Sequence, residues 1–130
     1  MGIQGVHVAL SVSDISVSGP WYEKVFEAQK LMEVTDDVGP IAIFINADGQ
    51  IIGIRQHGGT APGDRFDHLR IGLDHAGFNV SDLGEVEKWK ARLDELGIEN
   101  SGVQEDQVGY HLNFRDPDNI ALEIFAAKTA

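Results

Sequence analysis

An internal repeat constrains this chain more strongly than any other feature of its sequence. The segment His7-Val-Ala-Leu-Ser-Val-Ser-Asp14 aligns with His75-Ala-Gly-Phe-Asn-Val-Ser-Asp82 at an offset of 68 residues, and four of the eight aligned positions are identical. The same offset aligns Trp21 with Trp89. Self-similarity of this kind is the signature of a duplicated structural unit. The repeat therefore predicts two copies of one supersecondary module.

Each copy has the pattern of a strand, a helix and three further strands. Apolar and polar residues alternate over residues 5–12, which is typical of a strand with one buried face. The first copy is expected to continue with a helix after residue 16 and with strands at 30–35, 41–46 and 51–57. In the second copy we expect a strand at 73–80, a helix that begins after Asp82 and ends at Gly97, and strands near 101–106, 109–114 and 120–126.

These elements predict an α+β fold of two βαβββ modules. Their strands are expected to form a curled mixed sheet around a cup, with the helices on the outside. A chain of 130 residues fits a single domain spanning residues 1–130. Within that domain, the first module is assigned to residues 3–57, the linker to 58–72 and the second module to 73–126.

Composition excludes several classes of protein. The chain has no cysteine, so disulfide scaffolds, zinc ribbons and cysteine nucleophiles are excluded. Its net charge of −11 disfavours nucleic acids and anionic membranes as partners and suits cationic small molecules. The apolar runs are too short to span a bilayer, and no signal peptide is recognisable at the N-terminus. We therefore predict a soluble protein of the cytoplasm.

Three residues are candidates for binding a metal ion, because strand alternation places them on the faces opposite the helices. His7 alternates with Val6 and Val8, and the same reasoning applies to His75 and Glu123 on their own strands. If the sheet curls, the three side chains can converge. Two imidazoles and one carboxylate suit a divalent ion such as Fe, Mn, Ni, Co or Zn and leave positions open for substrate.

The sequence resembles the vicinal oxygen chelate superfamily, which groups glyoxalase I, extradiol dioxygenases, fosfomycin-resistance transferases and bleomycin-resistance proteins. The resemblance covers almost the whole chain and implies metal ligands at His7, His75 and Glu123. It also implies a homodimer. The segments that carry it are His7–Asp14, the helix Trp21-Tyr-Glu-Lys-Val-Phe26, Leu73-Asp-His-Ala-Gly-Phe78 and Phe114-Arg-Asp-Pro-Asp-Asn-Ile-Ala-Leu-Glu-Ile-Phe125.

The strand expected at 51–57 departs from the pattern of glyoxalase I, which places a metal-binding, proton-shuttling carboxylate there. The matching position is Gly53 or Arg55, depending on the register, and neither residue is a carboxylate. A proton transfer of the glyoxalase type is therefore disfavoured. Arg55 and His57 are candidate catalytic residues, Arg55 to bind a substrate carboxylate and His57 to act as an acid or base. The alternative is that both belong to the solvated end of a strand.

Two functions remain open from the sequence. The first is a glyoxalase- or dioxygenase-like metalloenzyme, a lyase, isomerase or dioxygenase, whose small substrate chelates the ion through vicinal oxygens. The second is a binding protein of the bleomycin-resistance type, which sequesters a cationic small molecule without chemistry. The remaining histidines, His68 and His111, have no supporting context and are expected at the surface.

Overall fold

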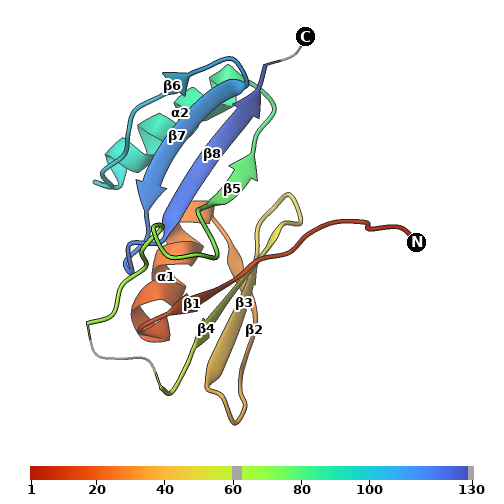
Figure 1. Ribbon diagram of the computed structural model, residues 1–130, viewed down its shortest axis with the longest axis vertical. Coiled ribbons are helices and arrows are strands. Elements are labelled where there is room, and N and C mark those ends of the chain that lie inside the picture. Colours follow the sequence, from red (N-terminus) through yellow and green to blue (C-terminus); the bar gives the residue numbers. More distant parts are fainter. Residues whose placement is uncertain (60–62, 129–130) are drawn as a thin grey trace. The chain divides into compact units, whose positions relative to one another are not determined.

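A computed structural model describes residues 1–59 and 63–128 (Figure 1). The chain divides into two compact units, Met1–Arg65 and Phe66–Ala130, and each is described by itself. The boundary falls inside the segment 58–72, which the sequence analysis assigns to a linker. Residues 60–62 of that segment lie outside the described residues.

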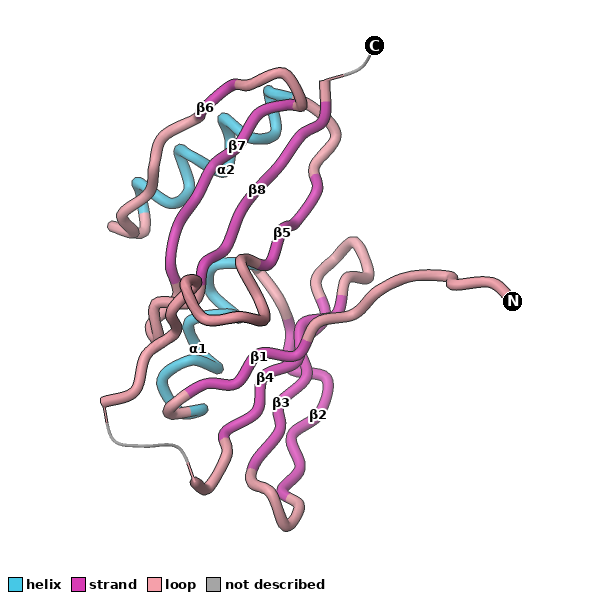
Figure 2. Tube along the Cα trace, in the orientation of Figure 1, coloured by secondary structure: helices cyan, strands magenta, loops and turns pink. Residues whose placement is uncertain are grey.

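The first unit contains one sheet and one helix. Its sheet has the order β1-β4-β3-β2, with β1 parallel to β4 and the other neighbours antiparallel (Figure 2). Along the chain the elements are β1 (Ala9–Val12), α1 (Ile15–Phe26), β2 (Gln29–Thr35), β3 (Pro40–Ile45) and β4 (Ile51–Gln56).

The second unit repeats this topology. Its sheet has the order β5-β8-β7-β6, and β5 is again the strand that runs parallel to its neighbour. The predicted α+β fold of two βαβββ modules is thereby confirmed. Along the chain the elements are β5 (Ala76–Asn79), α2 (Leu83–Glu95), β6 (Gln104–Glu105), β7 (Gly109–Arg115) and β8 (Ala121–Ala127).

Each unit buries the apolar face of its sheet against its helix. α1 contacts β3 and β4, while α2 contacts β7 and β8. The alternation of buried and exposed residues along β8 leaves every second side chain on the face away from α2. The buried core includes Tyr22, Val25, Phe44 and Ile54 in the first unit and Val86, Leu93, Leu112, Leu122 and Ile124 in the second.

The two helices begin at equivalent aspartates of the repeat. Asp14 accepts a hydrogen bond from the backbone N–H of Ser16 at 3.0 Å, and Asp82 accepts one from Glu85 at 3.0 Å. Gly97 follows the end of α2 with a φ of 71°, the left-handed conformation that favours glycine at a helix end. No helix in the described part of the chain is long and apolar enough for a membrane span.

Two predicted strands are shorter in the structure. The strand expected at 5–12 begins at Ala9, and the strand expected at 73–80 runs from Ala76 to Asn79. A strand extends only as far as its residues pair with a neighbouring strand. The pairing of β5 with β8 starts at Ala76, opposite Leu122. His7 and His75 therefore lie in the segments that lead into the strands. Their assignment to the strands themselves was wrong.

Candidate functional site

His75 and Glu123 lie side by side in the second unit. Leu122 and Ile124 are buried on the helix side of β8, so Glu123 projects from the opposite face. The two side chains approach to 3.7 Å between His75 Nε2 and Glu123 Oε1. The Glu123 side chain is 14% exposed and that of His75 is 43% exposed. The predicted pair is thus an imidazole and a largely buried carboxylate that face each other.

Asp74 contacts the other nitrogen of the His75 ring. Its Oδ2 lies 2.8 Å from His75 Nδ1, and this contact holds the pKa of Asp74 below its usual range. A carboxylate in this position can accept a proton from Nδ1, and Nε2 is the ring nitrogen that faces Glu123. Strand alternation would place Asp74 and His75 on opposite faces. Because residues 73–75 precede β5, Asp74 can instead fold back onto its neighbour.

His111 is a third member of this cluster, and its assignment to the surface was wrong. Its Nδ1 lies 3.2 Å from Glu123 Oε2, and its side chain is only 21% exposed. The sequence signal was the alternation in β7, where Leu112 and Phe114 are buried toward the helix. That alternation places His111 on the same face as Glu123. His68 is exposed as expected.

A cavity of about 250 Å³ lies beside this cluster. It is half enclosed by polar and apolar groups of the second unit, including His75 and Glu123. Cavities of roughly this size hold small molecules. Its lining consists of His68, Asp74, His75, Asn113, Phe114, Arg115, Ala121, Leu122 and Glu123.

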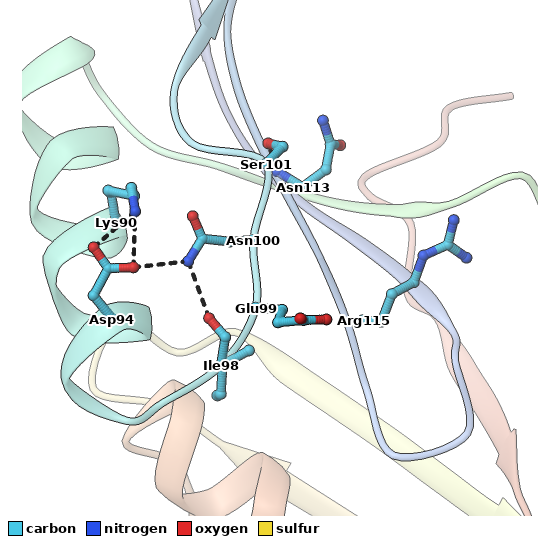
Figure 3. A pocket seen from close by; sticks show the side chains of 8 residues that line it. All are labelled: Lys90, Asp94, Ile98, Glu99, Asn100, Ser101, Asn113 and Arg115. Atoms are coloured by element: carbon cyan, nitrogen blue, oxygen red, sulfur yellow. Dashed lines mark hydrogen bonds and ion pairs between the residues drawn. The ribbon is translucent and has the colours of Figure 1, made fainter.

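A larger cavity of about 470 Å³ lies between α2, the segment after it and β7 (Figure 3). Its polar groups largely satisfy one another, because Lys90 pairs with Asp94 at 2.7 Å and Asn100 donates to Asp94 at 3.0 Å. It contains no histidine among its lining residues. We therefore place the candidate site at the smaller cavity, where the titratable side chains converge.

The first unit holds His7 and the strand that departs from the glyoxalase pattern. In β1 and β4, Ala9 pairs with Gly53, while in β5 and β8, Gly77 pairs with Glu123. Ala9 and Gly77 are equivalent in the repeat, so Gly53 occupies the position equivalent to Glu123. The open choice between Gly53 and Arg55 is thereby decided in favour of Gly53. The first unit therefore has a histidine equivalent to His75 but no carboxylate equivalent to Glu123.

Arg55 shares the strand face of Gly53, but its guanidinium already holds a carboxylate. Nη1 and Nη2 donate to the two oxygens of Asp36 at 2.9 and 3.0 Å. This two-point contact lowers the pKa of Asp36 and raises that of Arg55. Binding of a substrate carboxylate by Arg55 would have to displace Asp36. His57 follows the end of β4 and is exposed. The catalytic roles of Arg55 and His57 remain predictions.

The Asp36–Arg55 pair should make the first unit sensitive to acid. The pKa of Asp36 is lowered from 3.8 on folding, so its contribution to stability is present above that value and is lost as the pH falls through the folded pKa. Replacing Asp36 by asparagine should lower the urea midpoint at pH 6 and flatten its decline between pH 5 and 2. Urea titrations across this range test the expectation, with Asp37→Asn as a control of equal charge. If the urea midpoints of wild type and Asp36→Asn declined in parallel between pH 5 and 2, this expectation would be contradicted.

The three predicted metal ligands are divided between the units. His75 and Glu123 lie together in the second unit, whereas His7 is exposed in the segment before β1 of the first. Within residues 1–59 and 63–128, no group of three or more His, Asp or Glu side chains is arranged so that it could hold a metal ion. The three-residue site therefore stays a prediction.

Comparison with known families places these features in context. The model of the Glyoxalase/Bleomycin resistance protein/Dioxygenase superfamily matches residues 5–124, which is nearly the whole chain. The chain belongs to this superfamily. The resemblance stated from the sequence, to the vicinal oxygen chelate superfamily, is confirmed. No curated protein matches the sequence significantly.

Solved structures of the superfamily share the fold over almost their full lengths. A glyoxylase/bleomycin resistance protein/dioxygenase domain from Frankia sp. EAN1pec is 34% identical, with a TM-score of 0.89 over 98% of this chain and 100% of that one. The fosfomycin resistance protein FosX from Listeria monocytogenes is 23% identical, with a TM-score of 0.72 over 98% and 96%. Lactoylglutathione lyase from Agrobacterium tumefaciens is 20% identical, with a TM-score of 0.74 over 97% and 96%. FosX has also been crystallised in complex with Mn(II) and a sulfate ion.

Proposed function

We propose that the protein is a metal-dependent enzyme of this superfamily and that His7, His75 and Glu123 bind its divalent ion. The observation that carries the proposal is the approach of His75 Nε2 to Glu123 Oε1 at 3.7 Å, with Asp74 behind the ring at 2.8 Å. A carboxylate on the second ring nitrogen is the usual support of a histidine that ligates a metal. It fixes the tautomer and orients the lone pair.

The residues present fit such an ion. Metal bonds to imidazole nitrogen and carboxylate oxygen are about 2.0–2.2 Å long, so one ion can reach both atoms across their separation. Gly77 leaves the space beside them open, because a Cβ at that position would lie 3.8 Å from Glu123 Oε1 and 3.9 Å from His75 Nε2. His7 supports the proposal as the repeat equivalent of His75. We assign it as the third ligand.

The surrounding residues restrict the chemistry. A bound ion of the Fe, Mn, Ni, Co or Zn type would act as a Lewis acid toward two neighbouring substrate oxygens. The half-enclosed cavity of about 250 Å³ suits a small molecule. Gly53 offers no base at the position equivalent to Glu123. We therefore favour a reaction that needs no proton shuttle from this strand, such as a dioxygenation or an addition.

We further propose that the protein works as a homodimer. Membership of the vicinal oxygen chelate superfamily implies a dimer. In the first unit, β2 is one of the two edge strands and carries three large apolar side chains that are exposed. An exposed edge strand with apolar side chains offers a surface on which a partner chain can pair. The three side chains are Leu31, Met32 and Val34.

Metal content tests the proposed function directly. Protein purified without chelators or affinity-column metal should contain about one equivalent of a divalent transition metal per chain, because three protein ligands hold it. His75→Ala should lose that metal. His68→Ala, which removes an exposed histidine from the same cavity, should retain it. Elemental analysis of the three proteins measures the difference.

Two results would contradict the proposal. Folded wild type that stays empty after incubation with each of the five metals would exclude a metalloenzyme. A binding protein for cationic small molecules would then be the better account of the fold and of the net charge of −11. Loss of metal in His68→Ala but not in His75→Ala would place the ion elsewhere in the cavity.

A further inference from the structure

The carboxylate of Glu123 is shared between two histidines. Oε1 faces His75 Nε2 at 3.7 Å, and Oε2 faces His111 Nδ1 at 3.2 Å. Only the first of these imidazoles belongs to the predicted ligand set. His111 lies on β7, where its neighbours Leu112 and Phe114 are buried against α2. Its ring therefore stands on the same sheet face as Glu123.

The His111 ring is held on its other sides as well. Nε2 is buried and lies 2.9 Å from Asp106 Oδ2, a close ion-pair contact that lacks the geometry of a hydrogen bond. Asp106 is itself fixed, because its Oδ1 accepts the backbone N–H groups of Val108 at 2.8 Å and Gly109 at 3.0 Å. The ring of Phe125 packs against His111 with 5.0 Å between centroids.

These contacts place a carboxylate oxygen beside each ring nitrogen of His111, Glu123 Oε2 at Nδ1 and Asp106 Oδ2 at Nε2. The pKa of Asp106 is lowered to about 2, first by the N–H of Gly109 and then by His111. The separation of 3.2 Å between Nδ1 and Oε2 allows a ring N–H at Nδ1 to donate to Glu123.

We propose that His111 is a positioning residue that orients Glu123 for metal binding. By engaging Oε2, it holds the carboxylate so that Oε1 is the oxygen that faces His75. Ligating carboxylates are commonly held by hydrogen bonds of this kind, and losing them weakens metal binding. The inference rests on the proposed function, because it assigns His111 a role toward the same ion.

Two substitutions of His111 test the role. His111→Ala removes the donor to Glu123, whereas His111→Asn keeps an N–H near the position of Nδ1 and loses the contact with Asp106. Isothermal titration with Mn(II) and with Co(II) should show affinity about 10–100-fold weaker in His111→Ala. His111→Asn should recover most of this loss. Melting temperatures of the metal-free proteins establish that both variants are folded.

The outcomes separate this inference from the function on which it rests. Wild type that binds metal while His111→Ala binds equally well would overturn the role of His111 and leave the metal site intact. His111→Asn as weak as a folded His111→Ala would also overturn it, because the effect would then not depend on the donor at Nδ1. Wild type that binds neither metal would overturn both proposals. Weak binding in His111→Ala with recovery in His111→Asn supports both.

Discussion

Replacing Gly109 by alanine is expected to lower the free energy of unfolding of the second module by about 3 kcal/mol, at the upper end of the range for overpacked sites. Gly109 is the first residue of β7. An added Cβ would collide with the carbonyl oxygen of Ala126 and lie 2.8 and 2.9 Å from two ring atoms of Phe125. The backbone oxygen belongs to the β7–β8 ladder and cannot move without breaking the pairing. Urea denaturation of the variant measures the loss.

Gly77→Ala is the matched control for this substitution. Gly77 is also a strand glycine of the same sheet, but its added Cβ would meet its nearest atoms at 3.8 Å, an ordinary contact distance. Its stability should change by less than about 1 kcal/mol. If Gly109→Ala and Gly77→Ala had similar urea midpoints, the close approach of Phe125 and Ala126 to Gly109 would not be a constraint on the fold.

Replacing Glu123 by glutamine is expected to weaken metal binding by at least about 100-fold, beyond the usual effect of losing a residue that only supports a ligand. Glutamine keeps the volume and an oxygen that can accept from His111, so the fold should survive. It removes the negative charge that faces His75 Nε2 at 3.7 Å. Titration with Mn(II) or Co(II), together with melting temperatures, separates the loss of the ligand from a loss of structure.

Glu105→Gln provides the control of equal charge. Glu105 lies on β6, and its Oε1 pairs with Lys128 at 2.8 Å, so its neutralisation changes the net charge by the same amount. Metal affinity of Glu105→Gln should stay within about threefold of wild type, because exposed charges are largely screened by salt. Equal weakening in both variants would mean that net charge, rather than ligation by Glu123, determines the affinity.

Part of the candidate site follows from alternation along single strands. Glu123 stands on the open face of β8 because Leu122 and Ile124 are buried, and the sequence shows this pattern directly. The same alternation along β7 places His111 beside it, although His111 was expected at the surface. Asp74 was not predictable in this way, because its contact with His75 depends on the strand starting only at Ala76.

The Asp116–Asn119 turn was likewise predictable from the sequence only in part. The sequence indicates a tight turn, and asparagine at its last position tolerates a left-handed backbone. The structure confirms a φ of 67° at Asn119. The turn also holds the start of the second unit, because the Asn119 side chain donates to the carbonyl of Phe66 at 3.2 Å and Phe66 N–H donates to the carbonyl of Asp118 at 2.9 Å. No local signal marks that contact, which joins residues far apart in the chain.

The sequence alone determined the two-module architecture, because the repeat and the periods of 2.0 and 3.6 residues are local properties of the chain. The tertiary structure decided the register of the parallel pairs, which placed Gly53 rather than Arg55 at the position equivalent to Glu123. It also gave Arg55 its partner in Asp36. Parallel neighbours are distant in sequence, and their register is set by packing of whole faces against a helix. The missing fourth carboxylate itself was readable from the sequence, because neither Gly53 nor Arg55 is a carboxylate, and the folded chain decided only which of these two residues occupies the position.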